Sequence, residues 1–257
     1  MLETAQIKAF FTGRTDGVSP APYAACNLGL HVGDEEAHVI ANRERIAATY
    51  NLPLDTWVAG EQVHGSTVTV VTEEMRGRGA RALADMLPAT DALITNVSNI
   101  TLTTYAADCV PLLFADADRL AIGAAHAGWK GTVAKIAART VEAMHKTYGT
   151  DPASLRVQIG PSIGPCCYEV DDRVADAVRE SFGERAKRLL TPNANGRWQF
   201  DLWTANVLTL EEAGVPRERI ERLDACTSCQ NRRYFSYRKE GGNTGRLAGI
   251  IALKQEI

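Results

Sequence analysis

The sequence predicts an α+β fold in one domain, residues 1–257, with two packed mixed β-sheets and helices on the outside. Strand-like runs outnumber helical runs, and several of them follow one another without a helix between them. That order argues against the strand–helix alternation of a doubly wound parallel sheet. A chain of 257 residues, 45% of them hydrophobic, is also long enough to bury a substantial core.

Short apolar runs predict the β-strands. The apolar stretch around residues 110–125 is interrupted by Asp116, Asp118 and Arg119, so it indicates two buried strands. No apolar run reaches the roughly 20 residues that a membrane-spanning helix needs. The expected strands are residues 7–12, 67–72, 91–95, 100–105, 110–115, 120–125, 155–160 and 247–253.

Two longer segments have helical patterns. Asp34 is expected to N-cap the first helix, residues 35–50, whose first turn carries two glutamates near the positive end of the helix dipole. The second helix, residues 132–148, is expected to end at Gly149. One face of this helix is expected to point to the core, with Val133, Ile136, Ala137, Thr140, Val141, Met144 and Tyr148.

Two further helices are expected, residues 171–182 after Asp171 and residues 202–213 before Gly214. The basic, glycine-containing stretch at residues 76–85 is typical of an exposed loop or a short insertion rather than a domain boundary. The sequence has no internal repeat and neither a GxGxxG nor a Walker motif, so a Rossmann or P-loop nucleotide site is not expected.

Charge and cysteine content exclude several classes of protein. A formal net charge of −3 gives no electrostatic footprint for nucleic acid or an anionic membrane surface. The first residues, MLETAQIKAFFTG, do not have the pattern of a signal peptide. Six cysteines in 257 residues do not form a disulfide scaffold, so we expect reduced thiols and a cytoplasmic protein.

Three side chains are candidates for a metal site. Cys109 precedes one apolar run, His126 follows the next, and His64 lies in a short polar turn before the run at 67–72. Two imidazoles and one thiolate suit Zn²⁺ or copper, and three protein ligands are typical of a catalytic zinc with one open position. The spacing alone leaves a simpler alternative open, because a lone cysteine at a strand end is often only a small buried hydrophobe.

The other cysteines give a weaker signal. Cys226 and Cys229 form a CxxC pair, but no second pair at similar spacing completes a zinc ribbon, and ordinary packing is expected. The vicinal Cys166 and Cys167 lie in a turn-rich segment and are expected to be structural.

Positive and aromatic side chains gather in two segments. HAGWKGT places Trp129 and Lys130 three and four residues after His126, at the start of a helix that could hold a phosphate. YFSYRKEGGNTGR supplies aromatic rings with Arg238 and Arg246, a mixture that could stack a base and pair with an anion. A solvated hairpin with charged edges remains the alternative for the second segment.

Seven motifs together resemble the laccase-domain proteins, once called multicopper polyphenol oxidoreductase-like and now described as purine nucleoside phosphorylases. They are GEQVHGSTV, TDALIT, ADCVPLLF, AAHAGWKGT, IGPSIGPCCYEV, FDLWTANVLTLEEAGV and FSYRKEGGNTGR. The likeness extends over nearly the whole chain, and the combination of QVHG, ADC and HAGWKG is highly specific. The resemblance implies a single α+β domain in which His64, Cys109 and His126 hold one zinc ion.

The resemblance also implies an activity. It implies phosphorolysis of adenosine, inosine, guanosine and methylthioadenosine, and hydrolytic deamination of adenosine. The substrates would then be purine nucleosides and phosphate, with no nucleic-acid or membrane partner. In this interpretation Cys109, His126 and Asp108 are catalytic, and Asp108 is expected to orient a neighbouring group or shuttle a proton. About one equivalent of zinc is expected.

Substrate contacts are assigned by residue type within the family-like segments. The candidates for binding phosphate are Arg14, Arg43, Lys130 and Arg238. The candidates for contacting sugar or base are Asn27, His31 and Gln62.

Other functions stay open at this point. The resemblance also implies an alternative activity, the copper-dependent oxidation of phenols by a polyphenol oxidase of laccase type. A metal-free hydrolase, in which His126 activates the Cys109 thiol, would suit an editing role on peptidoglycan precursors. A protein with a purely structural metal site would instead surround the ion with four protein ligands.

Overall fold

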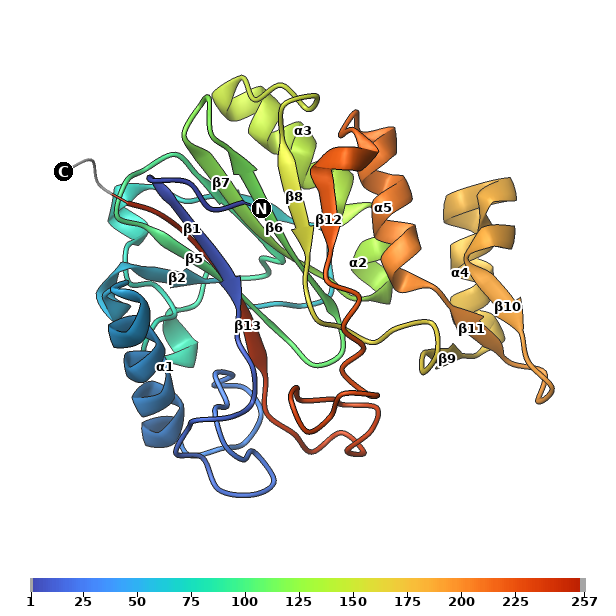
Figure 1. The fold of residues 1–257 in the computed structure, drawn as a ribbon, viewed down its shortest axis with the longest axis horizontal. Coiled ribbons are helices and arrows are strands. Elements are labelled where there is room, and N and C mark those ends of the chain that lie inside the picture. Colours follow the sequence, from blue (N-terminus) through green and yellow to red (C-terminus); the bar gives the residue numbers. More distant parts are fainter. Residues whose placement is uncertain (1, 255–257) are drawn as a thin grey trace.

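A computed structural model describes residues 2–254 of the chain. Two mixed β-sheets pack against each other, and helices cover the outer face of each (Figure 1). The predicted α+β class and the pair of packed sheets are therefore confirmed. A third, small sheet lies apart from the two main ones.

The smaller main sheet has four strands in the order β1-β13-β5-β2. Its strands are β1 (Ile7–Phe11), β13 (Leu247–Leu253), β5 (Thr101–Ala106) and β2 (Trp57–Ala59). The final strand β13 thus lies between the first strand and a central one, which ties the two ends of the chain together.

The larger sheet has six strands in the order β12-β8-β6-β7-β4-β3. Its strands are β12 (Ile220–Arg222), β8 (Arg156–Ile159), β6 (Val110–Asp116), β7 (Ala121–Ala127), β4 (Ala92–Thr95) and β3 (Val68–Val70). The central hairpin of β6 and β7 is buried along its whole length.

Helices cover the outer faces of both sheets. Helix α1 (Glu36–Tyr50) packs on the four-stranded sheet, with its buried side chains against Trp57 and Tyr105. The helices α2 (Trp129–Val133), α3 (Ile136–Tyr148) and α5 (Leu202–Glu212) share a core with the six-stranded sheet. The layers therefore alternate as helix, sheet, sheet, helices (Figure 1).

The alternation of side chains along β6 shows how two cores share one strand. Leu112 and Phe114 point toward the helices, whereas Leu113 and Ala115 point toward the other sheet. All four side chains are buried. A strand buried on both faces reads as a continuous apolar run, as residues 110–115 do.

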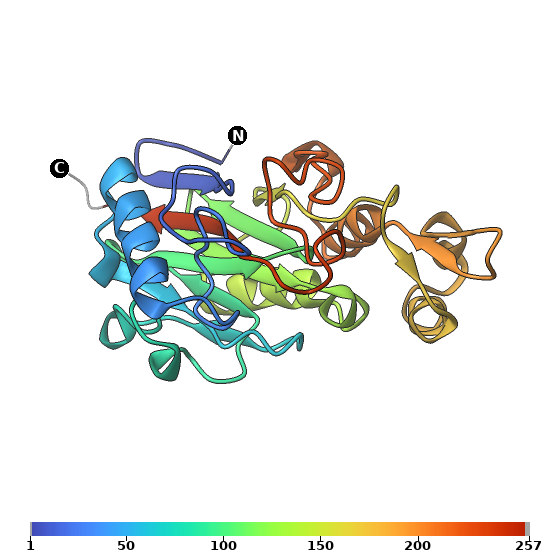
Figure 2. The same cartoon turned by 90° about the horizontal axis from the view of Figure 1, so that it is seen from below.

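The third sheet projects from the side of the molecule with α4 (Asp172–Phe182), as Figure 2 shows from below. Its strands are β10 (Leu190–Pro192), β11 (Trp198–Phe200) and β9 (Glu169–Val170). Asp171 caps α4, since its side chain accepts a hydrogen bond from the backbone of Val174, as the sequence predicts.

The eight expected strands are present, with ends that coincide with the expected ones or differ from them by one or two residues. Two helix predictions need correction. The side chain of Asp34 does not cap α1; Glu35 occupies the N-cap position, and Asp34 instead accepts hydrogen bonds from Ser19 and Asn27. The segment expected as one helix, residues 132–148, is broken between α2 and α3 by Lys135, which has a left-handed φ of 62°.

The buried face and the C-terminal end of α3 agree with the sequence prediction. The expected apolar face of α3 is buried at Ile136, Ala137, Thr140, Val141 and Met144, and Gly149 ends the helix with a φ of 70°.

The stretch at residues 76–85 is not fully exposed. Ala80 is buried, and the carbonyl oxygens of Gly79 and Ala80 accept hydrogen bonds from Arg43. Within residues 2–254, no helix is both long enough and apolar enough to cross a membrane.

Candidate active site

Cys109 and His126 meet because their strands pair in register. β6 begins directly after Cys109, and His126 lies near the end of β7, where it pairs with Pro111. Antiparallel pairing thus places the thiol and the imidazole at the same end of the β6–β7 hairpin, in the centre of the six-stranded sheet. His64 reaches this end of the hairpin from the loop between β2 and β3, where its backbone has a left-handed φ of 61°.

One carboxylate organises both imidazoles. Asp91 Oδ1 lies 3.0 Å from His126 Nδ1 and also accepts a hydrogen bond from the backbone N–H of His64. Asp91 Oδ2 accepts from the backbone N–H groups of Val63 and Gly65. Burial would raise the pKa of Asp91, but the hydrogen bonds from His126, Gly65 and His64 lower it below its usual range. The turn that presents His64 is therefore fixed to the same group that orients His126.

The three side chains fit one metal ion. The ligand atoms of His64, Cys109 and His126 lie within 4.8 Å of one another. Because His126 Nδ1 contacts Asp91, its Nε2 is the nitrogen left for a metal, the arrangement usual for metal-bound histidines. Two imidazoles and one thiolate match the donors that zinc and copper prefer, with one position open.

The local electrostatics favour a thiolate. Burial would raise the pKa of the Cys109 thiol, but the charge and hydrogen bonds of His126, and contacts with His64, lower it to about 6. Burial would lower the pKa of His126, but Cys109 and Asp91 raise it to about 9. The thiolate is the form of cysteine that binds a metal.

The triad opens into a pocket of about 470 Å³, a volume typical of a small-molecule site. Trp129, Tyr168 and Tyr237 supply aromatic walls, and Arg238 and Arg246 supply positive charge. Burial raises the pKa of Tyr168, so its hydroxyl remains protonated. Apolar walls with two guanidinium groups are suited to a ligand that has both a flat ring and an anionic group.

Asp108 holds two segments of the pocket wall together. Its Oδ1 accepts a hydrogen bond from Thr227 Oγ1 at 2.6 Å, and its Oδ2 accepts from the backbone N–H of Arg238 at 2.7 Å. Both carboxylate oxygens are therefore engaged in fixing loops that are distant in sequence. This places Asp108 as a positioning residue beside Cys109.

Two of the expected base or sugar contacts line the pocket. Gln62 is one of them, but its amide is bonded to the backbone N–H and carbonyl of Tyr105. His31 is the other; burial in the wall and the charge of Arg246 lower its pKa to about 4. Asn27 lies behind the wall, fully buried, and its Oδ1 accepts hydrogen bonds from the backbone N–H groups of Gly29 and Arg246.

The structure brings one of the four expected phosphate ligands to the pocket, Arg238. Arg43 is fully buried, and its guanidinium donates to the carbonyl oxygens of Leu28, Gly79 and Ala80.

The other two expected phosphate ligands also lie away from the lining. Arg14 is held by Glu240 and by the carbonyl oxygens of Ala24 and Asn231. Lys130 is exposed on α2 and does not line the cavity.

Sequence reasoning missed Asp91, Tyr168 and Thr227. Asp91 directly precedes a strand, as Cys109 does, and a charged residue at that place was the available signal. Tyr168 directly follows the vicinal cysteines, for which the sequence predicts a structural role. Thr227 had no local signal, since its contact with Asp108 spans 119 residues.

The family profile described as multi-copper polyphenol oxidoreductase laccase matches residues 8–254. The purine nucleoside phosphorylase YlmD of Geobacillus stearothermophilus is 40% identical over 248 residues, 96% of this chain and 90% of that protein. The adenosine deaminase RL5 of an unknown prokaryotic organism is 33% identical over 242 residues, 93% of this chain and 91% of that protein.

The fold is matched as well. The crystal structure of the Bacillus licheniformis hypothetical protein YfiH superposes with a TM-score of 0.94 at 40% identity, covering 96% of this chain and 93% of that one. Sequence and fold agree over nearly the same span. The chain belongs to the multi-copper polyphenol oxidoreductase laccase family.

Proposed function

We propose that this protein is a zinc-dependent purine nucleoside phosphorylase that also deaminates adenosine. The proposed nucleosides are adenosine, inosine, guanosine and methylthioadenosine. The observation that carries the proposal is the His64–Cys109–His126 triad in the lining of a pocket with aromatic walls and two guanidinium groups. The names of the relatives, purine nucleoside phosphorylase and adenosine deaminase, support it.

Different pocket residues would contact different parts of the substrates. Tyr168 and Tyr237 offer ring faces to a purine, and Arg238 and Arg246 offer guanidinium groups to phosphate. Burial lowers the pKa of Arg246, because a desolvated cation is costly, and a bound anion would offset that cost. Phosphorolysis needs this pairing, since an anion must lie beside the sugar while the base is held as a leaving group.

His64, Cys109 and His126 would hold the metal. A bound zinc ion supplies a Lewis acid that acidifies water, which suits hydrolytic deamination. Asp91 keeps the ring of His126 oriented, and Asp108 keeps Arg238 in the wall. The six free cysteines suit the reducing cytoplasm, which is the proposed location.

The direct test is phosphate-dependent release of hypoxanthine from inosine by the purified protein. Arg238→Ala should raise the KM for phosphate about 10- to 100-fold, because a hydrogen bond to a charged group contributes roughly 1.5–3 kcal/mol. The matched control is Lys130→Ala, an exposed cation on α2 that lies outside the pocket lining. Equal phosphate requirements in the two variants would remove Arg238 from the proposal.

Metal removal separates the proposed function from its rivals. Activity on inosine should be lost with a chelator and restored by zinc. Activity that survives chelation but is lost on thiol alkylation would favour the Cys109–His126 hydrolase. Oxidation of phenols that depends on copper, without phosphate-dependent cleavage, would favour the polyphenol oxidase.

A further inference from the structure

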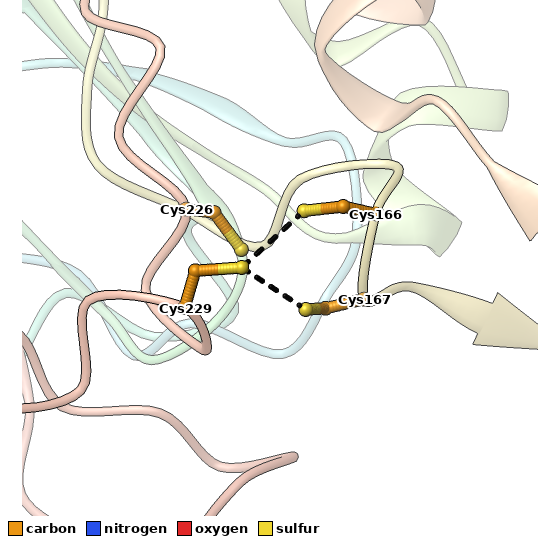
Figure 3. A group of neighbouring side chains, drawn as sticks. All are labelled: Cys166, Cys167, Cys226 and Cys229. Atoms are coloured by element: carbon orange, nitrogen blue, oxygen red, sulfur yellow. Dashed lines mark hydrogen bonds between the residues drawn. The ribbon is translucent and has the colours of Figure 1, made fainter.

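A second group of side chains suited to a metal lies outside the pocket. Cys166, Cys167, Cys226 and Cys229, here called the four-thiol cluster, place their sulfur atoms within 4.8 Å of one another. All four cysteines are free. Figure 3 shows the sulfurs of the vicinal pair pointing toward those of the CxxC pair. The second pair that a zinc site requires is thus supplied by cysteines about sixty residues upstream.

The spacing of the sulfurs suits a tetrahedral ion. Cys229 Sγ lies 3.6 Å from Cys166 Sγ and 3.4 Å from Cys167 Sγ. Four sulfurs at about 2.3 Å from a zinc ion stand about 3.8 Å apart. Small side-chain rotations would therefore close the cluster around one ion.

The backbone around the cluster has features of a metal-binding turn. The N–H of Gly164 donates to Cys226 Sγ at 3.3 Å, and such a donor stabilises a sulfur that carries negative charge. The CxxC spacing of residues 226–229 is the usual one for two zinc ligands from one turn. Cys226 is buried, whereas Cys166 and Cys229 are exposed, so an ion has a path of entry.

We propose that the four-thiol cluster binds one structural zinc ion, separate from the one at the His64–Cys109–His126 site. Four thiolates in tetrahedral arrangement are typical of a structural zinc site. Because the protein fills all four positions, no position is left for water or substrate. The expected zinc content of the whole chain then rises from one equivalent to two.

The ion would fasten together two loops that form the pocket wall. One loop carries Cys167, whose carbonyl oxygen accepts a hydrogen bond from Arg238. The other carries Thr227, between the two cysteines of the CxxC pair, and Thr227 holds Asp108. A bridge between Ser162 and Cys226 already joins these loops at the level of the backbone. A zinc ion at this site would therefore affect substrate binding only by holding Arg238 and Asp108 in position, without contacting the substrate.

The test is metal analysis of protein purified under reducing conditions. We expect two zinc equivalents in the wild type, one in Cys229→Ser and one in Cys109→Ala. The matched control is Cys26→Ser, a buried free cysteine outside both groups, which should keep two. The double variant Cys109→Ala/Cys229→Ser should hold none.

Cobalt gives a second measurement that does not depend on activity. In the Cys109→Ala protein, Co²⁺ should produce the strong sulfur-to-cobalt absorption of a tetrahedral tetrathiolate, and Cys166→Ser, at an exposed position, should weaken it. One equivalent in the wild type that Cys229→Ser leaves unchanged would overturn the proposal. So would a mass about 2 Da below that of the reduced chain, since it would show a disulfide within the cluster.

These outcomes are separable from the proposed function. If Cys109→Ala loses inosine cleavage but still binds one zinc equivalent at the four-thiol cluster, the loss is due to the pocket and not to the cluster. Absence of the second zinc equivalent, with normal cleavage, would refute the four-thiol site alone.

Discussion

Asp91 shows how one side chain can set the geometry of a whole site. It accepts hydrogen bonds from the His126 ring and from the backbone of His64, and also from Val63 and Gly65. Each of its oxygens faces two N–H donors. An amide in its place would turn an NH₂ group toward one of these donor pairs, whichever way it is oriented.

Asp91→Asn should therefore weaken zinc binding. Partners that orient metal ligands typically contribute 10- to 100-fold to affinity, and a rise of about that size in the zinc dissociation constant is expected. The measurement is competition for zinc with a chromophoric chelator. The matched control is Asp116→Asn, a buried carboxylate on the last residue of β6, at the other end of the β6–β7 hairpin, where it accepts hydrogen bonds from the backbone N–H groups of Asp118 and Arg119. Equal zinc affinities in both variants would contradict the role given to Asp91.

Residue type and position make His64, Cys109 and His126 candidate metal ligands, because few side chains bind zinc and each of the three lies beside an apolar run. The structure brings all three together, whereas it brings only Arg238 of the four phosphate candidates to the pocket. Arg43 was misassigned because an arginine in an amphipathic helix looks the same whether its guanidinium meets a phosphate or backbone carbonyls. Only the packing of α1 against the loop at Gly79 decides between them.

At the scale of elements, the junction of β7 and α2 depends on the absence of a side chain at residue 128. A Cβ on Gly128 would lie 2.9 Å from Cys109 Sγ and 2.9 Å from His64 Cδ2. Its φ of −70° is open to any residue, so the constraint is contact and not backbone strain. The end of β7 can approach Cys109 and His64 this closely only because residue 128 is a glycine.

Gly128→Ala should remove most of the zinc from the triad while leaving the fold intact. The added methyl group would push Cys109 and His64 apart, and the site cannot close around an ion when two of its ligands are displaced. Zinc content and circular dichroism measure the two effects.

Gly123→Ala in β7, the strand that ends just before Gly128, is the control for this substitution, since its Cβ would meet Ile94, Leu93 and Met144 at 3.3–3.4 Å, away from Cys109 and His64. It should lower the melting temperature without changing zinc content. Full zinc occupancy in Gly128→Ala would contradict the steric argument.

The elements themselves were predictable where the pattern was long. The apolar runs that form β5, β6, β7 and β13 predict strands of the right type. Five of the seven residues expected on the core face of residues 132–148 are buried, whereas Val133 and Tyr148 are half-buried. The strands β2, β9, β10, β11 and β12 have two or three residues each, too short to show a periodic pattern. β3 is as short, but it lies within the longer strand-like run of residues 67–72. The break before α3 rests on the left-handed backbone of Lys135, a residue type that carries no such signal.

At the scale of the whole molecule, the two sheets are coupled through shared strands. Consecutive residues of β6 enter different layers: Leu113 packs between the sheets, and Phe114 packs between the six-stranded sheet and the helices. Both side chains are fully buried. A change in one layer therefore acts on a strand that the other layer also needs, which favours a single cooperative unit over two independent ones.

Leu113→Ala and Phe114→Ala should each lower the stability of the entire chain. Truncation of a buried leucine costs about 2–5 kcal/mol and that of a buried phenylalanine about 3–5 kcal/mol. Because both residues belong to one strand, each variant should unfold in one transition, at a lower temperature than the wild type, in calorimetry and in near- and far-ultraviolet circular dichroism alike. Leu83→Ala, at an exposed position, should leave the transition unchanged. Two separate transitions, with only one of them moved by each variant, would mean that the layers fold independently and that the chain is not a single domain.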